Sequence, residues 1–255
     1  MSIRRNEYEQ PIGPAVEGWS PRQRPQRTQM TGRHCRLEPV SVARHEADLF
    51  AAYLEAPDGR DWTYLFSERP ERKEDFNAYL AKLEKSEDPL HFAIVAADTG
   101  KAVGTAALMR IEPAHGVIEV GSITFAPRLK QTRAATESMY LMMRRAFDEL
   151  GYRRYEWKCD SLNAPSRSAA ERYGFTFEGI FRQAIVYKGR SRDTAWYSIT
   201  AGEWPRVRHA FEAWLSPDNF DERGQQKQRL AQLRGGALGT VKSSPAVAGG
   251  VDMNE

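Results

Sequence analysis

Three strand-length apolar runs follow one another at residues 91–97, 102–111 and 116–125, with only short connections between them. The segment 98–101, Asp-Thr-Gly-Lys, is typical of a hairpin turn, and residues 112–115 can turn the second run into the third. Parallel neighbours would need connections of a dozen or more residues. The sequence therefore predicts an antiparallel meander at the centre of the chain.

Apolar residues recur at helical spacing on both sides of this meander. In chain order, the expected elements are a strand at 34–40, helices at 41–56 and 72–86, the three runs, a helix at 133–150, a strand at 152–160, a helix at 165–174 and a hairpin at 175–200. Gly151 and Gly174 stand where helix C-caps are expected. A meander followed by a strand–helix–strand unit favours a mixed α/β sheet covered by helices.

The two ends of the chain differ in composition from this central part. Residues 1–30 are rich in Pro, Gln and Arg, which predicts an extended N-terminal arm rather than a domain. Residues 201–235 are amphipathic, and the small polar residues of 236–255 are typical of a flexible tail. The expected organisation is an arm at 1–30, one α/β domain at 31–200, a helical extension at 201–235 and a tail at 236–255.

Several classes of protein are disfavoured by composition. No apolar run approaches 18 residues and no apolar segment follows the N-terminal residues, so we expect no membrane span, no secretory signal and a cytoplasmic location. The net charge is only +3 and the basic residues are spread, so no specific nucleic-acid partner is expected. Cys35 and Cys159 are too few for a disulfide scaffold, and no zinc-spaced cluster indicates a metal.

A basic loop opens the long central helix. It carries Arg128, Lys130 and Arg133 and leads into the small residues Ala134 and Ala135. Amides at a helix start lack backbone partners, and the helix dipole favours an anion there. The loop is therefore a candidate phosphate site, with a solvated basic loop as an equally acceptable interpretation.

A second motif follows the strand at 152–160. It reads N-x-x-S-x-x-x-x-x-x-x-G-F-x-x-E-G, with Asn163, Ser166, Gly174-Phe175 and Glu178-Gly179. Together with the basic loop, this spacing resembles the GNAT superfamily of N-acetyltransferases over residues 33–200, and within it the RimJ/RimL-like branch. The resemblance implies a mixed, mostly antiparallel sheet of six to seven strands flanked by helices. It also implies acetyl-CoA as the acetyl donor and an amine as the acceptor.

By the same resemblance, the strand ending near Phe125 diverges from the strand at 154–159 and holds the pantetheine arm between them, with the pyrophosphate on 131–136. The expected acetyl-CoA-binding residues are Ile123, Phe125, Lys130, Gln131, Thr132, Arg133, Ala134, Ala135, Thr136, Asn163 and Ser166. This chain departs from the family's Gln/Arg-x-x-Gly-x-Gly/Ala loop, because Ala134 and Thr136 replace both glycines. Their methyl groups reduce the space through which a phosphate can approach the backbone, although the Thr136 hydroxyl can itself donate to a phosphate oxygen. Asn163 has a helix N-cap as its alternative role.

Two residues are candidates for proton transfer. Glu119 is the expected general base, on a strand where alternation puts it on one face with Gly121 and Ile123; a surface carboxylate is the alternative. Amides near Ile123–Phe125 are the expected oxyanion donors if a bulge frees them. Many members of the family use a tyrosine where this chain has Ala170, so Ser166 is the expected acid for the leaving thiolate, with a structural hydroxyl as the alternative.

An aromatic segment lies between the first two helices. In the family this region shapes the acceptor site, so Trp62 and Tyr64 are expected to bind the substrate. Arg182, Tyr187 and Arg192 of the last hairpin are expected to border the same cleft. Core packing is the alternative for the aromatic residues. The function expected is transfer of acetyl to a primary amine, either a protein N-terminus or a small amine. A catalytically weak acyl-CoA sensor or docking module is the alternative, and the helical extension is compatible with a homodimer.

Overall fold

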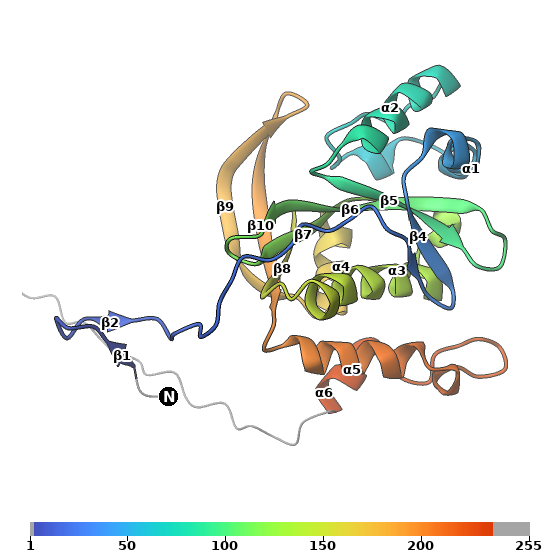
Figure 1. Ribbon diagram of the computed structural model, residues 1–255. Coiled ribbons are helices and arrows are strands. Elements are labelled where there is room, and N and C mark those ends of the chain that lie inside the picture. The colour runs from blue at the N-terminus through green and yellow to red at the C-terminus, as the bar shows by residue number, and fades with distance from the viewer. Residues whose placement is uncertain (1–2, 237–255) are drawn as a thin grey trace, which may run out of the picture.

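The computed structural model describes residues 3–236, and its centre is one twisted sheet (Figure 1). The strands are β3 (Met30–Thr31), β4 (Cys35–Pro39), β5 (Leu90–Ala96), β6 (Ala102–Glu112), β7 (Val117–Phe125), β8 (Arg154–Asp160), β9 (Thr176–Tyr187) and β10 (Arg190–Thr200). Their order across the sheet is β3-β4-β5-β6-β7-β8-β10-β9. The predicted mixed, mostly antiparallel sheet is confirmed, and the two-residue strand β3 brings the number of strands to eight.

Helices cover both faces of this sheet (Figure 1). They are α1 (Val42–Leu54), α2 (Lys73–Lys85), α3 (Arg133–Arg144), α4 (Ala164–Tyr173), α5 (Trp204–Leu215) and α6 (Leu230–Gly236). Apolar residues of α1 and α2 pack on one face, and those of α3, α4 and α5 belong to the larger core on the other. A π-helical turn, η3 (Arg145–Glu149), prolongs α3, and the chain leaves it through Gly151 at a φ of 68°.

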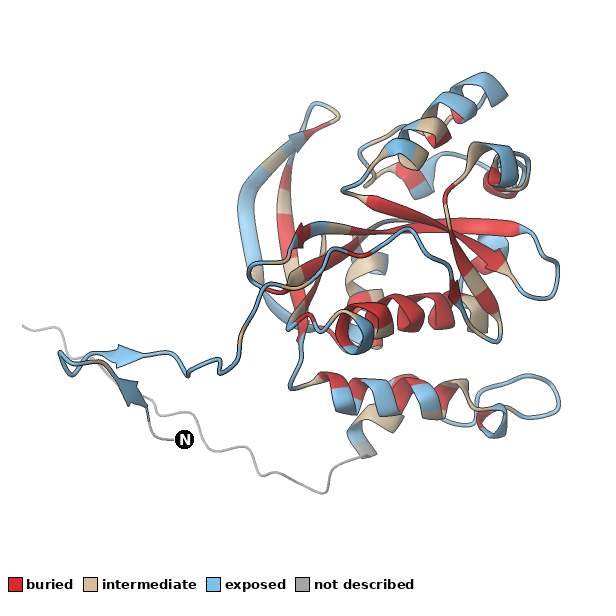
Figure 2. Ribbon diagram, in the orientation of Figure 1, coloured by how far each residue is buried: buried red, intermediate tan, exposed pale blue. Residues whose placement is uncertain are grey.

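Both faces of the central strands are buried. On β5, Phe92 and Ile94 belong to the core beneath α3, while Ala93 and Val95 belong to the core beneath α1 and α2. Successive residues of a strand point to opposite faces, so a strand covered on both sides reads as a continuous apolar run. Figure 2 shows these central strands and α3 as the most buried part of the molecule.

The neighbours β7 and β8 form the only parallel pair among the described strands, and they pair over just four residues. The register runs from Val117 opposite Arg154 to Val120 opposite Trp157. Beyond that point β7 stays paired with β6, and β8 stays paired with β10. The two strands therefore diverge from Gly121 onward, which confirms the expected splay.

A bulge interrupts β7 where it leaves β8. Gly121 lies opposite Ala107 of β6 and Thr124 lies opposite Thr105, so β7 carries one extra residue. Ser122 takes up the irregularity with a φ of 48°. The bulge changes the phase of the strand: Gly121 stays beside Glu119, but Ile123 packs against the core on the opposite face. The expectation that Ile123 shares a face with Glu119 was therefore wrong, because it assumed unbroken alternation.

The N-terminal arm has two parts. Two short strands, β1 (Arg4–Arg5) and β2 (Pro11–Ile12), pair in an exposed hairpin that projects from the body (Figure 1). The following segment runs along the body, where the Tyr152 hydroxyl donates to the carbonyl of Gln23 and Arg145 donates to the Thr28 hydroxyl. Of the predicted tail at 236–255, residues 237–255 lie outside the described residues.

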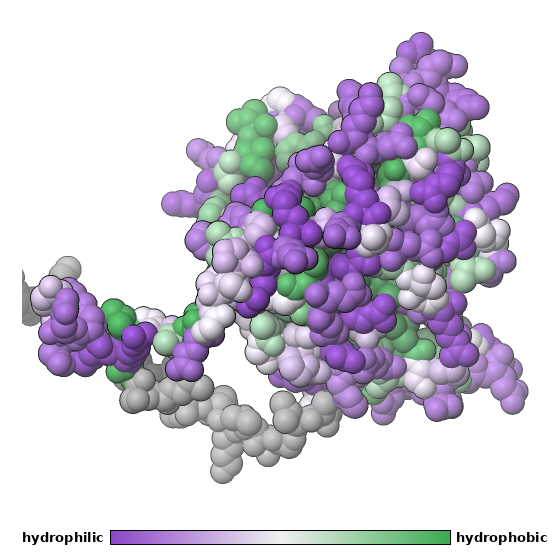
Figure 3. All heavy atoms as spheres, in the orientation of Figure 1, coloured by the Kyte–Doolittle hydropathy of each residue, from purple (hydrophilic) through white to green (hydrophobic). Residues whose placement is uncertain are grey.

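The surface seen in Figure 3 is largely hydrophilic. Apolar side chains that remain exposed include Phe177, Ile180, Phe181 and Val186 on the outer strand β9. Within residues 3–236, we find no helix with the length and apolar character needed to cross a membrane.

A buried carboxylate ties the start of the sheet to α3. Glu137 is 5% exposed, and its two oxygens accept the backbone N–H groups of Arg33, His34 and Cys35 at 2.6–2.8 Å. A Cβ on the preceding Gly32 would come within 2.4 Å of the same carboxylate. These contacts fix the first turns of α3, and with them the loop that opens it.

Replacing Glu137 by Gln should lower the free energy of unfolding by about 2 kcal/mol or more, since hydrogen bonds to a charged group are worth roughly 1.5–3 kcal/mol each. Urea denaturation monitored by circular dichroism measures the change. Glu222→Gln, at an exposed position, is the matched control and should stay within about 0.5 kcal/mol of the wild type. Equal stability of the Glu137 variant and the wild type would contradict this role.

Candidate active site

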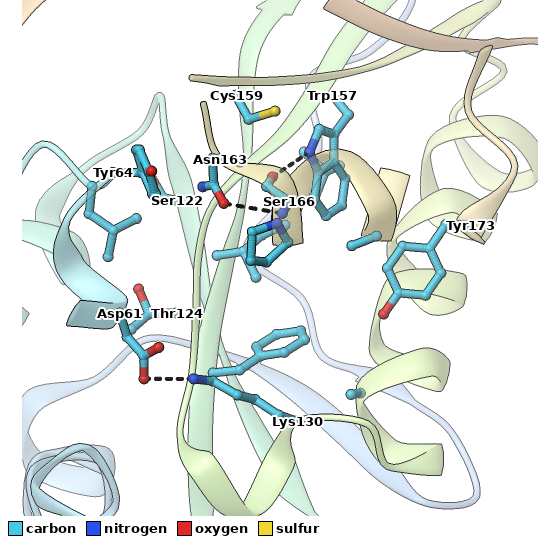
Figure 4. A pocket seen from close by; sticks show the side chains of 18 of the residues that line it. Asp61, Tyr64, Ser122, Thr124, Lys130, Trp157, Cys159, Asn163, Ser166 and Tyr173 are labelled. Carbon is cyan, nitrogen blue, oxygen red and sulfur yellow. Dashed lines mark hydrogen bonds and ion pairs between the residues drawn. The ribbon is translucent and has the colours of Figure 1, made fainter. Parts of the chain in front are cut away.

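The divergence of β7 and β8 opens a cleft of about 1230 Å³. Its walls come from segments far apart in the sequence: residues 61–67, β7, the start of α3, the end of β8, α4, Arg192 of β10 and the loop after α5. Figure 4 shows the part of this wall where Cys159, Asn163 and Ser166 gather, with the ion pair of Asp61 and Lys130 across the cleft from them.

Two backbone positions on β7 face the cleft without a strand partner. Ser122 and Ile123 are paired with neither β6 nor β8, because the bulge separates them from one and the splay from the other. Both residues line the cleft. Backbone amides at such a bulge, where they point into the cleft, are suited to hold a carbonyl oxygen that becomes negatively charged.

The start of α3 forms a second set of donors. Thr132 is the N-cap, and its hydroxyl oxygen accepts the N–H of Ala135 at 3.1 Å. The amides of Gln131, Arg133 and Ala134 donate to no acceptor within residues 3–236. Gln131 adopts a φ of 62°, which turns the chain sharply before the helix. Unpartnered amides at a helix N-terminus are suited to bind an anion.

The side chains of this loop are already engaged. Lys130 pairs with Asp61 at 2.6 Å, and the Arg133 guanidinium stacks 3.6 Å from the centre of the Phe220 ring. Thr136 is buried, and its hydroxyl donates to the carbonyl of Thr132 at 3.3 Å and accepts from Arg172 at 3.1 Å. A contact from the Thr136 hydroxyl to a phosphate would require the loss of its bond to Thr132. Backbone amides are therefore the readiest donors of this loop.

The C-terminal extension contributes to the same wall, although no local sequence pattern indicates this contact. Phe220, Gly224, Gln225 and Gln226 line the cleft beside Arg133, whose guanidinium also donates to the Gly224 carbonyl at 3.4 Å. These residues lie about ninety positions along the chain from the loop they contact. A contact over that separation cannot be predicted from the local spacing of apolar residues.

Asn163 and Ser166 are linked at the start of α4. The Asn163 side-chain oxygen accepts the N–H of Ser166 at 3.1 Å, so Asn163 is an N-cap. The Ser166 oxygen in turn accepts the indole N–H of Trp157 at 3.0 Å (Figure 4). Because its oxygen is the acceptor there, the Ser166 hydroxyl keeps its own proton available for donation, and the Trp157 bond polarises it.

Glu119 lines the cleft and is 4% exposed. Lys158 Nζ lies 2.9 Å from Glu119 Oε2 and 2.6 Å from Glu156 Oε2, and Arg110 Nε lies 3.6 Å from Glu119 Oε2. Burial raises the pKa of Glu119, and the positive charges of Lys158 and Arg110 only partly offset this effect. A carboxylate with a raised pKa is suited to exchange protons closer to neutral pH.

Two other reactive side chains, Cys159 and Tyr173, line the cleft. Burial raises the pKa of the Cys159 thiol, so the thiolate is disfavoured and Cys159 behaves as a small apolar residue. Tyr173 also lines the cleft, but it lies apart from Ser166 in Figure 4. Ala170, at the position of the family's tyrosine, is fully buried.

The aromatic segment divides between core and cleft. Trp62 is buried and packs edge-on against Tyr53 and Tyr79, although one part of it reaches the cleft. The Tyr64 hydroxyl donates to the carbonyl of Leu162 at 3.2 Å, which ties this segment to the loop after β8. Trp62 is thus a core residue that also lines the cleft, and its contact with the acceptor stays a prediction.

Tyr187 and Arg182 of the last hairpin were expected to border the cleft, but neither is part of its lining. Tyr187 does not line the cleft directly, but its hydroxyl donates to Asp160 Oδ2 at 2.7 Å, and Asp160 does line it. Arg182 lies in a separate hollow on the outer side of the hairpin, with Phe181, Gln183 and Asp193. Of the expected cofactor-binding residues, Ala134 is the one whose side chain lies outside the cleft lining.

Comparison with known proteins finds acetyltransferases, both by sequence family and by structure. A family model described as an acetyltransferase (GNAT) domain matches residues 35–176. A GCN5-related N-acetyltransferase from Brucella melitensis is 50% identical, with a TM-score of 0.85 over 86% of this chain and 100% of that one. A probable GNAT-family acetyltransferase from Chromobacterium violaceum is 39% identical, with a TM-score of 0.71 over 77% of this chain and 98% of that one.

A more distant likeness concerns the fold alone. Mycobacterium smegmatis RimJ, solved in complex with CoA-disulfide, is 19% identical, with a TM-score of 0.62 over 73% of this chain and 94% of that one. Among curated protein sequences, none matches this chain significantly.

Replacement of Asn163 separates its capping role from any other. Asn163→Ala should lower the free energy of unfolding by about 1 kcal/mol, because the N–H of Ser166 loses its acceptor. Asn163→Asp keeps an oxygen in place and should stay within about 0.5 kcal/mol of the wild type. Thermal and urea unfolding of the two variants test this difference, and equal stabilities would show that the cap contributes nothing.

Proposed function

Since this chain belongs to the GNAT acetyltransferase family, we propose that it transfers the acetyl group of acetyl-CoA to a primary amine by direct attack. One observation carries the proposal. The β7 bulge, where Ser122 and Ile123 have no register partner, and the unpartnered amides at the start of α3 lie along the same cleft. The first set suits a thioester carbonyl and the second suits a pyrophosphate, which matches the two polar ends of the donor.

Acetyl-CoA supplies a thioester whose acyl carbon is open to attack by an amine. The chain's own groups then have three tasks: to remove a proton from the amine, to hold the acyl oxygen and to return a proton to the sulfur. A nitrogen–carbon bond replaces the carbon–sulfur bond, and overall one proton passes from nitrogen to sulfur. A bound ammonium releases one more proton to solvent before this exchange.

Glu119 is the proposed proton acceptor. Its burial and raised pKa bring it nearer to the pKa of an amine than an exposed glutamate would be. The amides of Ser122 and Ile123 are the proposed donors to the acyl oxygen, since neither adjacent strand pairs with them. Ser166 is the proposed proton donor to sulfur, supported by the indole N–H that its oxygen accepts.

The acceptor and the branch are finer proposals. The motif with Asn163, Ser166 and Gly174-Phe175 supports the RimJ/RimL-like branch, and hence a protein N-terminus or a small amine as acceptor. The CoA-disulfide complex of a RimJ with the same fold supports coenzyme A in this cleft. The aromatic segment, with Trp62 and Tyr64, is the proposed acceptor wall.

The central test measures binding and turnover separately. Calorimetry with CoA and acetyl-CoA reports occupancy, and thiol release with a panel of peptides and small amines reports transfer. Binding with amine-dependent thiol release is the expected result. Absence of CoA binding at physiological concentrations would refute the proposal.

A second candidate function rests on the altered loop. Ala134 and Thr136 replace two glycines, and Thr136 is buried with its hydroxyl engaged. A domain that binds acyl-CoA without efficient transfer would act as a sensor or docking module. Thermal protection by acetyl-CoA with no amine consumed would favour this candidate.

Ala134→Gly tests how closely the loop approaches the cofactor. If the donors are backbone amides, removal of the methyl group should leave the Kd for CoA unchanged or up to about tenfold tighter, a difference of up to about 1.4 kcal/mol. Calorimetry measures the change. A tenfold weaker Kd would mean that the phosphates bind elsewhere.

Glu119→Gln should reduce kcat/KM by about 10²-fold or more, in the range expected for loss of a general base. The base must be ionised, so wild-type activity falls as pH drops through the pKa of Glu119. Because that pKa is raised, the acidic limb of the profile should lie above the range of an exposed glutamate. A pH profile of kcat/KM checks this, and an unchanged limb in the variant would remove Glu119 from the mechanism.

Lys158→Met tests the same assignment from the opposite direction. The positive charge of Lys158 lowers the pKa of Glu119, and the charge of Glu156 raises it. Loss of the lysine leaves two carboxylates near each other, so the acidic limb should move to still higher pH. A shift to lower pH would show that another group controls the limb.

A further inference from the structure

Arg192 is a buried arginine without an acidic partner. It is 6% exposed, lies on β10 and lines the cleft. Within residues 3–236, no carboxylate lies within 4.0 Å of its guanidinium, and its side chain donates no hydrogen bond. The similarly buried Arg145, by contrast, pairs with Glu149 at 2.6 Å and donates to the Thr28 hydroxyl at 2.9 Å.

Two acids near Arg192, Asp193 on the same strand and Asp160 on the neighbouring strand β8, accept hydrogen bonds from other groups. Asp160 accepts the Tyr187 hydroxyl with one oxygen and the N–H of Leu162 with the other, at 2.7 and 2.9 Å. Asp193 accepts the N–H of Gln183 at 2.7 Å. Burial of an unpaired charge is unfavourable unless a partner arrives. A ligand in the cleft is the available partner.

The surroundings of Arg192 restrict what this ligand is. Its guanidinium lies 5.6 Å from the centre of the Phe66 ring and 5.8 Å from that of Tyr187, which are 5.6 Å apart. The rings attract the guanidinium but accept none of its conventional hydrogen bonds, so its donors stay available to an oxyanion. Two residues along β10, the Thr194 hydroxyl is also buried without a partner in the described chain. The strand thus carries two polar groups with unused capacity.

The position of Arg192 argues against the phosphates of CoA as its partner. The proposed phosphate donors lie at the start of α3, on the wall completed by Phe220 and Gly224. Arg192 lies on the wall with the aromatic segment and the end of β8. The anion it pairs with therefore belongs to the acceptor.

We propose that Arg192 binds an oxyanion of the acceptor, so that the preferred substrate is a small amine carrying a carboxylate or phosphonate a few bonds from its nitrogen. The inference rests on the proposed transfer and names its substrate class. A guanidinium donates two parallel hydrogen bonds to a carboxylate or phosphonate, which fixes the acceptor's orientation as well as its affinity. The nitrogen is then directed toward β7, where Glu119 lies on the same cleft.

Binding is the primary test, because it does not require turnover. Calorimetry on the full chain saturated with CoA would compare the common α-amino acids with their α-amides and their decarboxylated amines, with aminoalkylphosphonates as a second anionic arm. At least one acid should bind about 10- to 100-fold more tightly than its amide, the range for a hydrogen-bonded charge pair. Preference for the carboxylate or the phosphonate arm identifies the oxyanion.

Variants assign this preference to Arg192. Arg192→Gln should abolish the acid-over-amide preference, and Arg192→Lys should retain part of it, because a lysine keeps the charge without the fork. An unchanged Kd for CoA shows that each variant is folded. Arg206→Gln, which removes an exposed arginine on α5, is the control for net charge and should keep the full preference.

The outcomes separate this inference from the proposed function. No acid binding at least tenfold better than its amide, or a preference that survives in Arg192→Gln, overturns the assignment. Tighter binding of peptides with uncharged side chains than of any acid overturns it as well. Acid-selective binding without thiol release would support the site while refuting transfer, and turnover without acid selectivity would do the reverse.

Discussion

The short parallel pairing of β7 and β8 determines where the cleft can be. Two parallel neighbours need a crossover connection, and here α3 provides it. The crossover leaves from the end of β7, so α3 must begin at the edge where the two strands end. Because their pairing stops after Val120 and Trp157, the helix N-terminus and the bulged end of β7 border one gap. Topology alone thus brings two sets of backbone donors together.

The ion pairs of Lys158 with Glu119 and Glu156 form at the point where β7 and β8 diverge. Lys158 lies just past the last paired residue of β8, where it contacts Glu119 of β7 and Glu156 of its own strand. The ring of Trp196 covers its ammonium at 3.8 Å. Two adjacent carboxylates offset the desolvation of a buried ammonium. This pairing keeps Glu119 ionisable despite its burial, while burial still raises its pKa.

Local patterns were enough to predict most of the fold. The apolar runs of β5, β6 and β7 and the caps at Gly151 and Gly174 lie where periodicity and turn chemistry put them. The bulge at Ser122 was expected only conditionally, because no residue type there demands it, and its effect on the phase of Ile123 was missed. Contacts between distant segments, such as Arg133 with Phe220, leave no periodic signal. The eighth strand, two residues long, is too short to produce a pattern.

The two ends of the cleft therefore differ in how much of their chemistry can be predicted from the sequence. The proposed donor end is built from main-chain amides at Ser122, Ile123 and the α3 start, so substitution of a side chain there leaves its hydrogen-bonding groups in place. The proposed acceptor end is built from side chains of residues 61–67 and of β10. Its chemistry is set by single residues such as Arg192, and only the assembled strands show that no carboxylate of the described chain lies within ion-pair distance of it. A shared fold can accordingly fix the donor while leaving each chain free to select its own amine.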